Sequence, residues 1–143
     1  MREKALSLLG LMRRANAVDV GEENTGCAVR GGRAKLLLTA CDASENARKR
    51  AEGFAAGRNV TAVELPFEKA ELSAALGLPG CSMAAVTDLG FADALMKILS
   101  ELDESYGAPA EEIRLRLERT EHRRKDSGIR DRTKRIGKRR TKA

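Results

Sequence analysis

Helix-like and strand-like patterns of apolar residues alternate along most of the chain. A first helix, expected to end near residue 15, is indicated by apolar residues at the spacing of one helix face: Ala5, Leu8, Leu9 and Met12. Residues 17–20 (AVDV) alternate between apolar and polar, which is typical of a short strand. Residues 22–30 form a weaker helical pattern, because Gly26 lies inside it. The chain is therefore predicted to begin helix, strand, helix.

The strongest strand pattern is KLLLTA at residues 35–40, where three successive leucines place apolar side chains on both faces. A strand of this kind is expected to be covered by helices on both sides of a sheet. Asp42 is predicted to cap the next helix, with Glu45 completing a capping box. We expect that helix to occupy residues 43–56 and to bury Ala47, Ala51, Phe54 and Ala55.

The alternation continues to about residue 102. Further strands are predicted at residues 60–65 and 82–87, and a further helix at residues 67–76. Asp88 is predicted to cap a last helix, whose apolar stripe consists of Phe91, Ala94, Leu95, Ile98, Leu99 and Leu102. Strands that alternate with helices predict an α/β fold, here a three-layer α/β/α sandwich with a central mixed sheet of about four strands.

The composition changes after residue 105. We predict a folded domain over residues 1–105 and a basic, largely disordered extension over residues 106–143. Residues 111–125 are compatible with a charged helix, but its large apolar residues alternate and form no helical stripe: Ile113, Leu115 and Leu117. From residue 126 onward the chain has almost nothing to bury, so disorder is expected there in the absence of a partner.

The net charge is concentrated in this extension. The 143-residue chain carries a formal charge of +6, but residues 110–143 hold 14 Lys and Arg against 6 Asp and Glu, a net charge of +8. The remaining 13 basic and 15 acidic residues leave residues 1–109 at −2. A positive charge gathered in one segment indicates a polyanionic partner, and nucleic acid fits this best.

Several kinds of chemistry lack the residues that they require. The three cysteines form no CxxC pair and the only histidine, His122, lies in the basic region, which predicts reduced thiols in a cytoplasmic protein and no metal site. Residues 21–28 have the glycine spacing of a phosphate-binding loop, but Cys27 and Ala28 replace its Lys and Ser/Thr. We therefore expect no enzyme activity and no cofactor. No apolar run is long enough to span a membrane.

The order of the elements and three stretches of sequence resemble the ribosomal protein 7Ae/30e family, which has the kink-turn RNA-binding fold. The stretches are residues 9–46 (LGLMRRANAVDVGEENTGCAVRGGRAKLLLTACDASEN), residues 76–88 (LGLPGCSMAAVTD) and the GFADALMKIL that follows. The resemblance covers residues 3–102 and is closest to the bacterial, ribosomal-protein-like branch. It implies a non-enzymatic, monomeric protein that binds kink-turn or ribosomal RNA and associates with ribosomes or translation.

The resemblance also implies two RNA-binding segments. In the family, a Gly-Thr-Asn-Glu-x-x-Lys motif at the start of the second helix binds RNA. Aligned on AKLLLTACDAS, the motif falls on Gly21, Glu22, Glu23, Asn24 and Cys27. The glycine matches, the Asn-Glu pair is reversed and the Lys is absent. The second segment, the loop before the last strand, falls on Leu78, Pro79, Gly80, Cys81, Ser82 and Met83.

Basic residues are predicted to extend this surface. We expect five of them to line the same end of the sheet, and we predict RNA contacts for the last two: Arg13, Arg14, Arg30, Arg33 and Lys35. In the extension, six cations are predicted to neutralise phosphates without reading sequence: Lys134, Arg135, Lys138, Arg139, Arg140 and Lys142. The other interpretation of the extension is a solubilising segment.

Two alternative functions stay open for the domain. It is either a stand-alone accessory module of an RNA-modification or ribosome-assembly complex, or a protein-interaction module that has lost RNA binding. The absence of the motif Lys at Cys27 is the feature that favours the second alternative.

Overall fold

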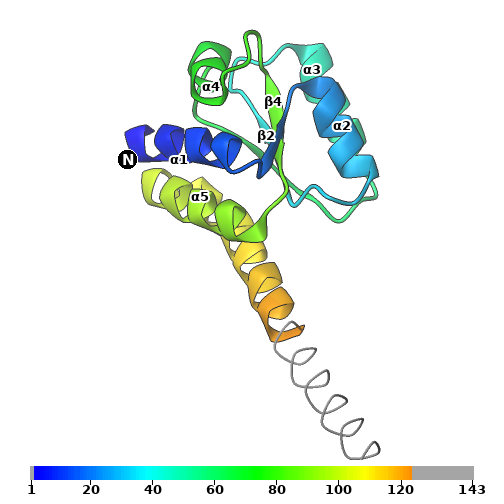
Figure 1. Cartoon of the computed structure of the whole chain (residues 1–143), viewed down its shortest axis with the longest axis vertical. Helices are drawn as coiled ribbons and strands as arrows, with labels where there is room; N and C mark the ends of the chain where they lie inside the picture. The colour runs from blue at the N-terminus through cyan, green and yellow to red at the C-terminus, as the bar shows by residue number, and fades with distance from the viewer. Residues whose placement is uncertain (1, 124–143) are drawn as a thin grey trace, which may run out of the picture.

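Four strands form one mixed sheet at the centre of the protein (Figure 1). In the computed structural model, which describes residues 2–123, the sheet order is β1-β4-β2-β3. The edge strand β1 (Val18–Val20) and the inner strand β2 (Leu36–Thr39) both run antiparallel to β4 (Met83–Val86). The other edge strand, β3 (Thr61–Glu64), is parallel to β2. The predicted mixed sheet is confirmed.

Helices cover both faces of this sheet. One face packs against α1 (Arg2–Arg14), α4 (Lys69–Leu76) and α5 (Leu89–Leu102). The opposite face packs against α2 (Glu22–Arg30) and α3 (Glu45–Ala55), which lie side by side in Figure 1. The three-layer α/β/α architecture predicted from the sequence is therefore confirmed.

The three leucines of β2 show why the central strand is apolar on both faces. Leu36 and Leu38 point into the larger core, on the side of α1 and α5, and both are completely buried. Leu37 points to the opposite face, where it packs with Ala47 and Ala51 of α3. Because successive side chains of a strand alternate between its faces, a strand between two helical layers needs apolar residues throughout.

A C-terminal helix at residues 107–123 follows α5 and the short 3-10 turn Glu104–Tyr106. It projects beyond the sheet in Figure 1, but Ile113 is completely buried in the larger core. Leu115 on the same helix is 38% exposed. The predicted disorder from residue 126 onward and the six predicted phosphate contacts of the extension lie outside the described residues.

The predicted cap of α3 is wrong. The cap of α3 is Ser44, whose Oγ accepts the backbone N–H of Ala47 at 3.2 Å, and not Asp42. Asp42 Oδ1 instead accepts the backbone N–H of Lys69 at 2.7 Å, so it caps the first turn of α4 from a distant part of the chain. In α5, the buried apolar residues are Ala92, Leu95, Met96 and Leu99. Leu95 and Leu99 belong to the predicted stripe, whose members Phe91, Ile98 and Leu102 are partly buried and pack against the same core.

Replacing Asp42 by alanine is expected to destabilise the protein by about 1 kcal/mol, because the first-turn amide of α4 would lose its carboxylate acceptor. Asparagine keeps an acceptor oxygen and should lose less. Urea unfolding of the two variants measures both changes. Equal losses for Asp42→Ala and Asp42→Asn would contradict the capping role.

Candidate functional site

The start of α2 and the loop after α4 lie next to each other at one end of the sheet, where β1 ends and β4 begins. Gly21 is the N-cap of α2, and its backbone N–H donates to the carbonyl of Met83 at 3.1 Å. A Cβ at Gly21 would lie 3.4 Å from Cδ2 of Leu78, and the φ of Gly21 is +94°, in the region that favours glycine. The structure therefore brings together the two segments that the sequence placed in one binding surface.

The outer face of α2 carries the middle of the predicted motif. Glu23, Asn24 and Cys27 are exposed, whereas Thr25 and Ala28 on the other side of the helix are buried. The amide of Asn24 donates from Nδ2 to the carbonyl of Val20 at 2.9 Å, which holds this side chain against the end of β1. Three residues of the predicted set thus share one solvent-facing strip of the helix.

The first turn of α2 has no side-chain cap. Its amide groups and the positive end of its dipole therefore face the same end of the sheet as the loop after α4, and two carboxylates, those of Glu22 and Glu23, lie in the same turn. Glu22 is held by Arg50 of α3, with Oε2 and Nη1 2.8 Å apart. Arg50 was missed by sequence reasoning, because 28 positions separate the pair and no local pattern links them.

Only part of the loop after α4 is open to solvent. Leu78, Pro79 and Gly80 are exposed, and Ser82 is half-buried, whereas Cys81 and Met83 are buried. Burial raises the pKa of the Cys81 thiol, against the opposing effects of the backbone amide of Gly21 and the charge of Arg13. Cys81 therefore stays a neutral core residue, and residues 78–80 form the exposed tip.

Arg33 and Lys35 do not lie at this end of the sheet. Lys35 precedes β2, and its backbone N–H donates to the carbonyl of Val86 at 2.8 Å, at the end of β4. Gly21 bonds instead to Met83, at the start of the same strand. Lys35 and Gly21 therefore lie at opposite ends of the sheet. Arg33 forms a 3.6 Å ion pair with Asp19. The prediction that these basic residues line the same end of the sheet as the start of α2 is wrong for Lys35, because α2 runs from that end to the opposite one, where residues 31–35 follow it.

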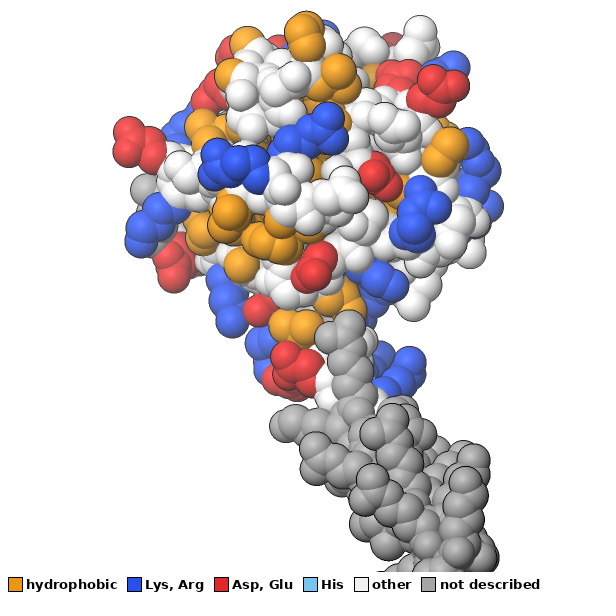
Figure 2. All heavy atoms as spheres, viewed as in Figure 1, with side chains coloured by type: hydrophobic (Ala, Val, Ile, Leu, Met, Phe, Trp, Pro, Cys, Tyr) orange, Lys and Arg blue, Asp and Glu red, His pale blue; other side chains and the backbone are white. Residues whose placement is uncertain are grey.

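Basic residues do not gather into one patch on the face shown in Figure 2. There, Lys and Arg side chains are interspersed with acidic and hydrophobic ones over the globular part of the molecule. Within residues 2–123, no helix is long and apolar enough to cross a membrane. Among the described residues on this face, no broad positive field marks a binding surface.

Comparisons with known proteins place the chain among named relatives. It is 37% identical over 91 residues to the RNA-binding protein YlxQ of Enterococcus faecium, an alignment that covers 64% of this chain and 86% of the relative. It is 35% identical over 96 residues to the RNA-binding protein YlxQ of Bacillus subtilis (strain 168), covering 64% of this chain and 91% of the relative. No family model matches the chain.

A solved structure shares the fold. A protein of unknown function from Bacillus halodurans superposes with a TM-score of 0.62 at 28% sequence identity, covering 68% of this chain and 97% of that one. Together with the two relatives, which this chain matches over most of their length, the comparison leads to one conclusion. The chain belongs to the family of the YlxQ proteins.

Proposed function

We propose that this protein is a non-enzymatic RNA-binding protein that recognises a structured RNA, a kink-turn or ribosomal RNA. The names of both YlxQ relatives support RNA binding, and YlxQ proteins are members of the 7Ae family that the sequence resembles. The observation that carries the proposal is the hydrogen bond from Gly21 to Met83, which joins the start of α2 to the loop after α4. We further propose that the protein acts as a cytoplasmic monomer in association with ribosomes.

Each part of this surface has a distinct role in the proposed complex. The uncapped amides and the dipole of α2 bind a backbone phosphate. The side chains of Glu23 and Asn24 face the guanine edges that sheared G·A pairs expose. The exposed tip at residues 78–80 packs Leu78 against a base that is splayed out of the helix. Phosphate contacts position the RNA, and the side chains of α2 specify it.

Position 27 is the main departure from the family motif, since the motif Lys is replaced by an exposed cysteine. Nη2 of Arg30 donates to the thiol sulfur of Cys27 at 3.6 Å. A cation therefore already lies beside position 27, one turn further along the helix than the motif Lys would lie. This arrangement supports a retained, weaker phosphate contact.

Replacing Cys27 by lysine is expected to tighten binding to a kink-turn RNA, because it adds one phosphate contact. The slope of log K against log salt should steepen by about 0.7 to 0.9, the change expected for one neutralised phosphate. Fluorescence anisotropy over a series of salt concentrations measures this slope. Cys27→Gln is the matched control, since it changes the side chain without adding charge. If both variants bind alike, position 27 does not face the RNA.

The decisive test compares two RNAs, an intact kink-turn and the same RNA with its G·A pairs replaced. The full chain must be used, because truncation at residue 107 would remove Ile113 from the core. We expect at least a tenfold preference for the intact kink-turn, which corresponds to about 1.4 kcal/mol. Equal affinities would reject kink-turn recognition, and no binding to either RNA would favour a protein-interaction module.

A further inference from the structure

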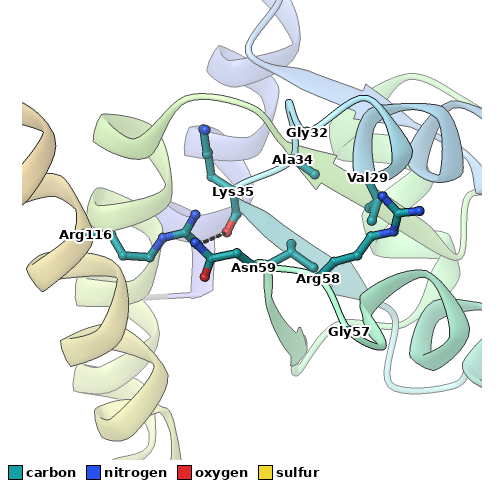
Figure 3. Close-up of a pocket in the computed structure, with 9 residues that line it drawn as sticks. Val29, Gly32, Ala34, Lys35, Gly57, Arg58, Asn59 and Arg116 are labelled. Carbon is teal, nitrogen blue, oxygen red and sulfur yellow. Dashed lines mark hydrogen bonds between the residues drawn. The ribbon is translucent and has the colours of Figure 1, made fainter.

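A cationic pocket lies at the end of the sheet opposite to the start of α2 (Figure 3). It has a volume of about 370 Å³ and lies between the end of α2, the turn before β3 and the C-terminal helix. Val29, Ala34 and Val60 contribute its apolar lining. Gly32, Gly57 and Asn59 also line it, and no lining residue is acidic. Three cations from three separate segments belong to the lining: Lys35, Arg58 and Arg116.

These three cations have no carboxylate partner among the described residues, which is also true of other exposed cations such as Lys4 and Arg119. Within the described residues, several arginines form ion pairs, as Arg33 does with Asp19 and Arg50 with Glu22. Over the same residues, neither Lys35, Arg58 nor Arg116 lies within ion-pair distance of a carboxylate. The lining therefore carries positive charge that no lining carboxylate offsets, which favours a bound anion.

Backbone contacts hold two of the three side chains in place. Nη1 of Arg116 donates to the carbonyl of Lys35 at 3.3 Å, the contact drawn as a dashed line in Figure 3. Nη1 of Arg58 donates to the carbonyl of Arg30 at 3.5 Å, at the end of α2. Each guanidinium has further N–H donors that these single bonds do not use. The pocket is therefore partly ordered before any ligand binds.

We propose that this pocket binds backbone phosphates of RNA, as a second contact distinct from the surface at the start of α2. The proposal rests on the proposed RNA binding, but not on kink-turn recognition. A phosphate contact of this kind adds affinity without sequence preference.

An RNA strand fits the pocket better than a single free anion. The cations lie on three different elements around an open rim, an arrangement that suits successive phosphates of a chain. The helix that contributes Arg116 also leads directly into residues 124–143, which contain 10 Lys and Arg against 2 Asp and Glu. An RNA held by that basic segment is delivered to the pocket at the other end of the same stretch of chain.

The test measures how RNA affinity depends on salt for the full chain and two double variants. Arg58→Gln with Arg116→Gln removes two pocket cations. Lys4→Gln with Arg119→Gln removes the same charge from exposed positions that do not line the pocket. We expect the salt slope to fall by about 1.5 for the pocket variant, at about 0.7 to 0.9 for each lost phosphate contact, and by clearly less for the control. Equal reductions in both variants overturn the proposal.

Three further measurements separate the remaining explanations. The ratio of affinities for the intact and the G·A-replaced kink-turn should not change in the pocket variant; a change overturns a phosphate-only contact. Arg58→Lys with Arg116→Lys should keep the slope, and its loss would point to misfolding and overturn the proposal.

Inorganic phosphate tests for a free-anion site. If it raises the unfolding midpoint of the wild-type chain but not of the pocket variant, while both have the same RNA salt slope, the pocket is a free-anion site and the proposal is also overturned. A wild-type ratio of one, with the pocket effect intact, rejects kink-turn recognition and leaves this site standing.

Discussion

Ile113→Ala is expected to lower the free energy of unfolding by about 2 to 5 kcal/mol, the range for deleting a large aliphatic side chain from a packed core. Ile113 is completely buried, and it packs in the same cluster as the core residues of α1, α5 and β2. The cost arises because the surrounding helices cannot fully close the cavity that the substitution leaves. Urea unfolding followed by circular dichroism measures the change.

Leu115→Ala is the matched control, since it shortens an aliphatic side chain two positions away on the same helix. Leu115 is 38% exposed, so its replacement should change the stability by no more than about 0.5 kcal/mol. Similar small losses for both variants would mean that the C-terminal helix does not pack on the domain in solution. A large loss for Ile113→Ala alone supports a folded unit that continues beyond residue 105.

The C-terminal helix was predictable from the sequence, but its packing on the core was not. Ile113, Leu115 and Leu117 are too few and too regularly alternating to form a stripe, so the charge of the region dominated its interpretation. In the structure, Ile113 is the only one of the three that is completely buried, and it enters a core built mostly by other elements. One buried large apolar residue leaves no periodic signal in the sequence.

The central strand was predictable because its environment is symmetric. Leu36, Leu37 and Leu38 all face helices, so an uninterrupted apolar run is what the fold requires. Asp42 shows the opposite case. Its acceptor oxygen serves the amide of Lys69, and nothing near either residue in the sequence identifies the partner. Local rules therefore assigned it to the nearest helix start, which Ser44 occupies instead.

The candidate site was predictable in one half only. The resemblance identified the start of α2 and the loop after α4, and the contact between Gly21 and Leu78 places them together. The expected position of Lys35 depended on strand directions that the sequence does not encode locally. Because β1 and β2 both run antiparallel to β4, both begin at the same end of the sheet. Lys35 lies at that end, whereas Gly21 follows β1 at the other end. The position of Lys35 at the opposite end of the sheet therefore follows only from the strand pairing.

Neutralising the basic extension is expected to give the largest change in RNA binding. The variant replaces six cations by glutamine: Lys134, Arg135, Lys138, Arg139, Arg140 and Lys142. If each one neutralises a phosphate, the slope of log K against log salt falls by about 4 to 5 units. Residues 124–143 contain no aromatic side chain, so base stacking cannot replace the lost charge. Anisotropy titrations at several salt concentrations measure the slope.

A charge-conserving control makes this result specific to phosphate contacts. Exchanging Lys for Arg and Arg for Lys at the same six positions keeps the charge and should keep the slope. The preference for an intact kink-turn should survive in both variants, because the extension holds phosphates and the start of α2 reads the bases. An unchanged slope after neutralisation would make the extension a solubilising segment. Loss of the preference would mean that the extension takes part in recognition, and that the two functions are not divided between the domain and its basic end.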